Sequence, residues 1–319
     1  MGKKDRNQRK KKDRQDRLRR AKHRQHYGPN AGFDGGPADE LELPPETATE
    51  RLLWERSRRP SLLGRLRVLL FGRSEPSPRD RAQELAFDAL EAADPTAAVD
   101  LARQALALDP DCSDALYVLA LDAGTPAERL RFLERAVEAA GRTLGGPLYI
   151  EANRGHFWGL LETRPYMRSR AALADVLRGE GRVDEAVRHY AALLDLNPND
   201  NQGLRDVLLG CYLRAGDLDG ARGLLGRYAE EPGAVFGYGR VLERFLSGDP
   251  AGAADALREA RRQNPHVEAY LTGRKRLPAQ QPAYCSPGDE NEAVHCAIYL
   301  LDPWARHPEA VAWLKGRPA

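Results

Sequence analysis

The chain has 319 residues, which is enough for one or two domains with a sizeable core. Lys and Arg (49) nearly balance Asp and Glu (47), but residues 1–26 hold 13 of the basic residues against 3 Asp. A basic N-terminal segment with a net charge of +10 therefore precedes a body with a net charge of −8, counting His as neutral. No stretch reaches the roughly 18 apolar residues of a membrane span, and the charged N-terminus lacks the apolar centre of a secretory signal. These features exclude a transmembrane protein at the sequence level, and we expect a cytoplasmic location.

Residues 1–46 are expected to form a disordered basic tail followed by a linker. Residues 1–26 carry almost no apolar side chains, so they cannot bury enough surface to offset the entropy lost on ordering. Residues 27–46 are rich in Gly and Pro, as linkers are. We favour a tail that only solubilises the protein. The alternative is a nucleic-acid- or ribosome-associated factor, in which the Lys and Arg side chains within residues 3–24 would bind a phosphate backbone in a salt-dependent way. No aromatic residue within 1–26 is available to stack on bases, which argues against sequence-specific binding.

Residues 47–78 are expected to form amphipathic docking helices. The run from residue 61 to residue 71 is strongly apolar and carries two Arg, which predicts a helix of about three turns. We favour docking of this helix on the body of the protein, because the terminal repeats of a helical array expose apolar faces that need cover. The alternative is that it lies on a membrane surface.

Residues 79–275 predict paired short helices separated by regularly spaced turns. Turns begin at Gly181, Gly216 and Gly248, at intervals of 35 and 32 residues. These intervals bracket the period of about 34 residues that characterises one class of helical repeat. Helix starts are also predicted at Thr125-Pro126 and Asp249-Pro250, where a capping side chain precedes a first-turn proline. We expect four to five helical hairpins, beginning near residues 79, 113, 167, 202 and 234, with an irregular insertion at 141–163.

Apolar residues within these segments follow the helical period. One stripe steps through i, i+3, i+4, i+7 and i+8, and consists of Leu204, Val207, Leu208, Cys211 and Tyr212. A strand does not explain this spacing. Residues 276–319 are expected to form a helical C-terminal cap. The predicted fold class is therefore all-α, an α-α superhelix with a disordered basic N-terminal tail.

The repeat pattern resembles the tetratricopeptide (TPR) family, most closely at residues 167–200. Four residues fall on the signature positions of that family, namely Leu173, Ala186, Tyr190 and Pro198. The resemblance implies a TPR-like solenoid without enzymatic activity, which binds a protein or peptide in its concave groove as a scaffold or adaptor. It also implies no cofactor. The partner and the oligomeric state are not specified by these residues.

A second resemblance covers residues 165–314. It is carried, in order, by Gly181-Arg182, Glu185-Ala186-Val187, Tyr228, Asn264-Pro265-His266-Val267-Glu268-Ala269-Tyr270-Leu271, Gly288-Asp289, Glu292-Ala293 and Trp304. This order is similar to the C-terminal region of the suppressor-of-tumorigenicity-seven family. The resemblance implies a helical, TPR-like interaction protein without a known catalytic role. The abundance of Ala, Arg and Gly is typical of a bacterial protein from a GC-rich genome.

Aromatic and charged residues crowd the entrance to one repeat at residues 155–167. One interpretation is a partner-binding pocket at the edge of the groove, where Arg164 would meet an acidic group. Its candidate residues, with two from the following helix, are His156, Trp158, Arg164, Tyr166, Arg168 and Asp175. The alternative, which we favour, is structural: Phe157 and Trp158 anchor the insertion, and Thr163 and Pro165 start the next helix.

Some TPR proteins hold a C-terminal carboxylate with Asn and basic side chains on successive first helices. The corresponding positions here are Arg168, Ala171, Ala172 and Asp175, followed by Gly203, Asp206, Val207 and Gly210. This set lacks the clamp, so binding of chaperone tails is not expected.

The residues for catalysis or metal binding do not form a recognisable pattern. His156 and Glu162 would serve as a base and its orienting group, but no nucleophile or metal ligand lies at a workable spacing. Asp289 and Glu292 are interpreted as a helix cap rather than a metal pair. The cysteines, which are Cys112, Cys211, Cys285 and Cys296, occur singly, and this argues against a zinc site or a disulfide framework. We expect no enzyme and no metal.

Overall fold

The computed structural model describes residues 76–230 and 233–317, and all regular secondary structure in this part of the chain is helical. Among these residues, no helix combines the length and apolar character needed to cross a membrane. The predicted basic tail, the linker and the helix at 61–71 lie outside the described residues. Phosphate binding by the tail and docking of the 61–71 helix therefore stay predictions.

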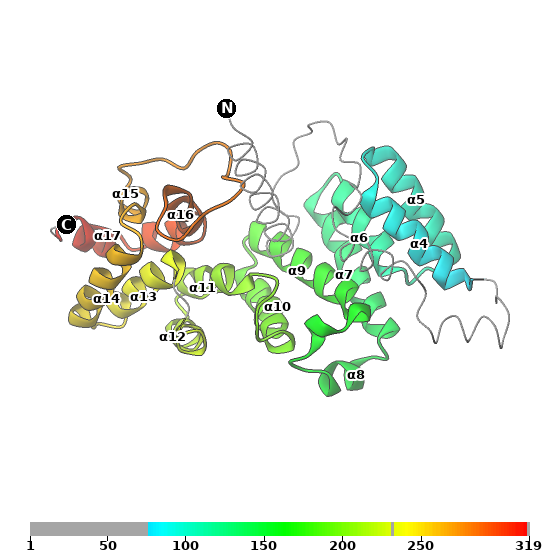
Figure 1. Cartoon of the computed structure of the whole chain (residues 1–319), viewed down its shortest axis with the longest axis horizontal. Helices are drawn as coiled ribbons and strands as arrows, with labels where there is room; N and C mark the ends of the chain where they lie inside the picture. Colours follow the sequence, from blue (N-terminus) through cyan, green and yellow to red (C-terminus); the bar gives the residue numbers. More distant parts are fainter. Residues whose placement is uncertain (1–75, 231–232, 318–319) are drawn as a thin grey trace, which may run out of the picture.

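Five helical hairpins follow one another in the described part of the chain, in a row that can be followed in Figure 1. They pair α4 (Pro78–Glu91) with α5 (Pro95–Leu108), α6 (Ser113–Asp122) with α7 (Pro126–Thr143), α9 (Arg164–Gly179) with α10 (Val183–Leu196), α11 (Leu204–Ala215) with α12 (Leu218–Arg227), and α13 (Ala234–Leu246) with α14 (Pro250–Gln263). The expected helical hairpins are confirmed, including the one near residue 113.

The hairpins turn where glycines and capping side chains predicted them to. Gly181, Gly216 and Gly248 have φ angles of 76°, 73° and 76°, in the left-handed region where a Cβ would be strained. The side chain of Thr125 accepts a hydrogen bond from a backbone N–H in the first turn of α7, and Asp249 does the same for α14. The glycines and capping residues therefore determine where each helix begins and ends, and side-chain packing joins the helices.

The insertion between the second and third hairpins begins after Thr143, where α7 ends, rather than at residue 141. It consists of α8 (Pro147–Ala152) and the two 3₁₀ turns η1 (Phe157–Gly159) and η2 (Leu161–Thr163). Phe157 is fully buried and packs edge-on against the ring of Tyr166 in α9. The insertion is thereby fixed to the body of the protein by an aromatic anchor.

The row of hairpins curves toward the side of its first helices. Helix α4 contacts α6, α6 contacts α9, and α11 contacts α13, whereas no comparable contact joins the second helices α5 and α7 or α10 and α12. The third and fourth hairpins differ, because they meet through α10 and α11 rather than through α9 and α11. Within the first three hairpins and within the last two, first helices therefore lie closer together than second helices, which bends a helical array toward the first-helix side. The surface formed by α4, α6, α9, α11 and α13 is termed the first-helix face.

Three further helices follow the last hairpin: α15 (Val267–Leu271), α16 (Glu290–Ala305) and α17 (Pro308–Lys315). Helix α16 packs against both α11 and α13, and Figure 1 shows it on the side of α11 opposite α12. Its inner side consists of residues that are at most 3% exposed, namely Ala293, Val294, Cys296, Ala297, Leu300 and Trp304. Helix α16 is thus part of the hydrophobic core and not a surface attachment.

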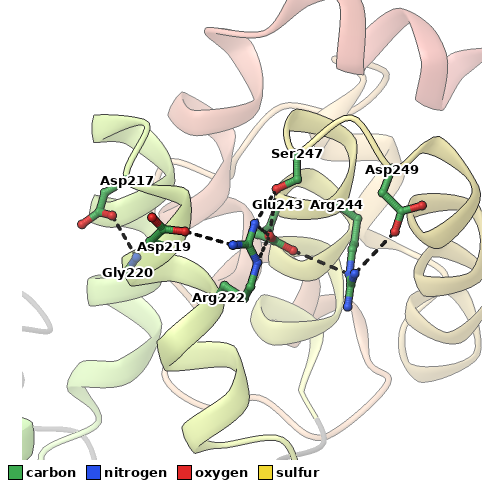
Figure 2. A network of polar contacts seen from close by, with 8 residues as sticks. All are labelled: Asp217, Asp219, Gly220, Arg222, Glu243, Arg244, Ser247 and Asp249. Carbon is green, nitrogen blue, oxygen red and sulfur yellow. Dashed lines mark hydrogen bonds and ion pairs between the residues drawn. The ribbon is translucent and has the colours of Figure 1, made fainter.

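A polar network joins the fourth hairpin to the fifth (Figure 2). Glu243 of α13 is 2% exposed, and its carboxylate accepts hydrogen bonds from Arg222 Nε of α12 at 3.0 Å and from Ser247 Oγ at 2.9 Å. Arg244 lies on the other side of this carboxylate, with 3.7 Å between Nε and Oε2. Because every partner of Glu243 named here comes from these two hairpins, the network links the hairpins. The two arginines also neutralise the charge of the buried carboxylate.

Candidate partner-binding surface

The first-helix face is occupied over α11 and α13 by α16. A Cβ atom at Gly210 would lie 2.6 Å from the carbonyl oxygen of Tyr299, so the glycine allows the two backbones to approach. Asp206 Oδ2 lies 3.2 Å from His295 Nε2, and Arg214 also pairs with α16 by placing Nε 3.3 Å from an Asp302 carboxylate oxygen. Asp206 and Gly210, two of the positions compared above with a carboxylate clamp, therefore face α16.

The segments that carry the second family resemblance meet beside α16. Asn264 Nδ2 donates to Glu292 Oε2 and to the backbone carbonyl of Asp289, both at 2.9 Å. The other carboxylate oxygen of Glu292 accepts from the N–H of Ala234, the first residue of α13, at 3.2 Å. As predicted, Asp289 caps α16 by accepting from the backbone N–H of Glu292 at 2.7 Å. The two motifs thus hold α16 in place.

A polar chain crosses the first-helix face between α4, α6 and α9. Gln83 of α4 donates to Asp114 Oδ2 of α6 at 2.9 Å, and Arg168 of α9 places Nη2 3.5 Å from the other carboxylate oxygen. Asp114 is fully buried, whereas the Arg168 side chain is 31% exposed. The guanidinium also lies 5.9 Å from the ring centroid of Tyr117, within the range of a cation–π contact. Arg168 is thus the member of the series Gln83–Asp114–Arg168 that reaches the surface.

Arg164 stacks on Trp158 at the beginning of α9. Its Cζ lies 3.6 Å from the centroid of the indole ring, and its Nε and Nη2 donate to the Trp158 carbonyl at 3.1 and 2.6 Å. Among the described residues, no carboxylate forms an ion pair with this guanidinium. Burial lowers the pKa of Arg164, and the positive charge of Arg168 lowers it further. The two arginines therefore lie in one electropositive region.

The remaining predicted site residues do not join Trp158, Arg164 and Arg168. Tyr166 is 6% exposed, and its hydroxyl accepts a hydrogen bond from Arg170 at 2.6 Å. Asp175 accepts from the hydroxyl of Tyr190 in α10 at 2.6 Å, and burial together with Asp175 raises the pKa of that tyrosine. His156 is an exposed residue of the insertion. The six residues thus belong to different environments within and beside α9.

The groups weighed for catalysis are separate in the structure. Glu162 accepts a hydrogen bond from the hydroxyl of Tyr149 at 3.0 Å and makes none with His156. Burial raises the pKa of Cys211 to about 11, which keeps this thiol protonated at neutral pH. Residues 76–230 and 233–317 contain no group of three His, Cys, Asp or Glu side chains arranged to hold a metal ion. These residues therefore form a curved, partly basic surface that could bind another molecule.

Comparison with known proteins identifies the repeats. One tetratricopeptide-repeat family model matches residues 84–140, from α4 to α7, and another matches residues 177–233, from the end of α9 through α12. This chain contains tetratricopeptide repeats. TPR arrays generally serve as scaffolds for protein interaction, and both matches fall on helical hairpins and leave out the insertion. The TPR resemblance predicted from the sequence is confirmed.

The chain is also similar to Protein ST7 homolog of Caenorhabditis elegans. The two are 25% identical over 245 residues, which covers 65% of this chain and 45% of that protein. The chain thus spans less than half of the relative's length. This similarity supports the second resemblance, whose motifs hold α16 against the TPR hairpins.

The sequence did not predict the partners of Arg168 or the packing of α16 on the first-helix face. Asp114 resembled an ordinary acidic residue in the first turn of a helix, and its signal was its place at the start of an otherwise apolar run. For α16 the signal was Gly210, a glycine in the middle of an apolar helical stripe, which indicates a close backbone approach. Neither signal identifies the contacting residue, because both contacts join distant parts of the chain.

Proposed function

We propose that this TPR protein is a non-enzymatic scaffold or adaptor that binds a protein partner on the first-helix face of α6 and α9. The observation that carries the proposal is the uneven occupation of that face. Helix α16 covers it over α11 and α13, whereas no further described helix packs extensively on α6 and α9. Arg168, whose side chain is 31% exposed, also lies on the uncovered part of this face. TPR arrays commonly bind their partners on this side.

Site-specific photo-crosslinking in the host cell tests the proposal. A photoreactive amino acid placed at Ala171, on the first-helix face of α9, should capture a defined partner that mass spectrometry then identifies. The matched control places the same amino acid at Arg188 of α10, whose side chain is 69% exposed. Equal capture from both positions, or no capture at Ala171 across several growth conditions, would count against the proposal.

A further inference from the structure

We infer that Arg164, Arg168 and Trp158 form a subsite for a carboxylate, so that the partner presents an acidic side chain to the beginning of α9. This inference rests on the proposed function and specifies the chemistry of the partner. The three residues are termed the carboxylate subsite.

The charge balance of the subsite leaves one positive charge. Arg164 and Arg168 are four residues apart on one helix, so their side chains share a face. Arg168 pairs with Asp114, which is fully buried and also accepts a hydrogen bond from Gln83. Arg164 forms no ion pair with a carboxylate of the described residues, so its positive charge is not balanced within the subsite. One further negative charge would complete the site and relieve the repulsion between the two arginines.

Arg164 is held in position and keeps donors available. A guanidinium has five N–H donors, of which Arg164 uses one on Nε and one on Nη2 for the Trp158 carbonyl. Stacking on the indole at 3.6 Å fixes the plane of the group, and this reduces the entropy lost when a ligand binds. The remaining donors suit the two oxygens of a carboxylate, while the ring offers an apolar contact to the methylene groups of Asp or Glu.

The same charge balance favours a carboxylate over the other occupants. A phosphorylated side chain carries close to two negative charges at neutral pH, which is more than the subsite lacks. The segment at 61–71 of this chain carries Arg65 and Arg67 and no acidic residue, so the subsite would repel it. Residues 39–50 of the chain are acidic and would compete with a partner, which makes them an outcome of the test below.

Fluorescence anisotropy with the full-length protein tests the inference. The probe is a fluorescein-labelled helical peptide of Ala, Leu and Glu, and the matched peptide has Gln in place of every Glu. We expect the Glu peptide to bind at least tenfold more tightly at low salt, with a difference that shrinks as salt is added. Arg164→Gln should remove most of this preference. Arg188→Gln, which removes the same charge from an exposed site on α10, should leave it intact.

Two further variants separate ligand contact from a structural role. Arg164→Lys keeps the charge and loses the planar fork, so it should retain part of the preference. Asp114→Asn adds one unit of positive charge while keeping the size of the side chain, and it should raise the affinity for the Glu peptide. A merely structural Arg164 or Asp114 would lower the affinity for both peptides alike, and that result would overturn the inference.

Two outcomes would contradict the inference that a partner supplies the carboxylate, and both would leave the proposed function standing. In one, the partner captured at Ala171 is captured equally well after Arg164→Gln. In the other, the Glu peptide binds only after Asp39, Glu40, Glu42, Glu46 and Glu50 are all changed to neutral residues, because the chain fills its own subsite. Absence of any capture at Ala171, combined with a preserved preference for the Glu peptide, would instead contradict the proposed function.

Discussion

At the scale of single residues, the half-buried side chain of His189 in α10 makes the free energy of unfolding depend on pH. Its Nδ1 accepts a hydrogen bond from Arg170 Nε at 3.3 Å, and burial, followed by the charges of Arg170 and Arg188, lowers its pKa to about 4. A histidine in the unfolded chain titrates near pH 6.5. Between about pH 6.5 and pH 4 the unfolded state therefore binds a proton that the folded state does not. The stability that neutral His189 contributes is present above pH 6.5 and is lost progressively as the pH falls toward 4.

Replacement of His189 by Gln should remove this part of the pH dependence. Gln keeps an acceptor for Arg170 and does not titrate. We expect the wild-type protein to lose about 1 kcal/mol more than the variant between pH 7 and pH 5, after allowing for partial exposure to solvent. Urea unfolding at a series of pH values measures the difference.

The comparison with the variant is needed because Asp200 acts in the opposite direction. Burial raises the pKa of Asp200 to about 6, so the folded state takes up this proton before the unfolded state does. Acidification from pH 6 therefore adds stability through Asp200 and offsets the loss through His189 in the wild-type protein. If the free energy of unfolding changes with pH in the same way for the wild-type and His189→Gln proteins, His189 is not held neutral by the fold.

At the scale of elements, the contact between α11 and α16 depends on a glycine. Gly210→Ala would place a Cβ 2.6 Å from the backbone carbonyl of Tyr299, where only a shift of α16 can relieve the clash. We expect a loss of about 1–3 kcal/mol in the free energy of unfolding. Gly226→Ala in α12 is the matched control, because nothing lies within 4 Å of its Cβ position. It should be neutral or add about 0.5–1 kcal/mol through helix propensity.

Thermal or urea unfolding of both variants checks this prediction. If Gly210→Ala is as stable as Gly226→Ala, the helices would not be in the close contact described here.

The elements themselves were predictable from sequence to a large extent. Gly181, Gly216 and Gly248 mark turns because only glycine adopts their backbone conformation without strain, and the predicted helix starts fall within three residues of the observed ones. The seat of α16 was not predictable. Helical periodicity shows which side of a helix is apolar and not which distant segment covers it. The same limit explains why Arg168 was identified and its partner Asp114 was not.

At the scale of the whole molecule, the hydrophobic core is divided unevenly. The buried residues of the cluster around the first hairpin are alanines, with Val118 and Cys112, and its leucines are only partly buried. The main cluster contains most of the buried Leu, Tyr and Trp side chains and includes α16. Alanine buries little apolar area, so contacts around α4 and α5 contribute less free energy than those around α11 and α13.

Hydrogen exchange should reveal this difference. We expect the backbone amides of α4 and α5 to exchange at least tenfold faster than those of α11, α13 and α16, because the first hairpin opens without the rest. Mass spectrometry of peptides from the exchanged full-length protein measures the rates. Uniform protection from α4 to α16 would indicate a single cooperative unit and contradict the division.

The place of α16 also affects how the protein is made. His295 contacts a residue 89 positions earlier in the chain, Asp206, so the inner side of α11 is complete only after synthesis has passed residue 295. At roughly 5–20 residues per second, that interval is about 4 to 18 seconds. Helix α16 packs against α11 and α13 and not extensively against the first three hairpins, so we expect those three to form before it is made. The fourth and fifth hairpins would then leave the ribosome with an uncovered apolar side. It is these two hairpins that a nascent-chain chaperone would need to protect.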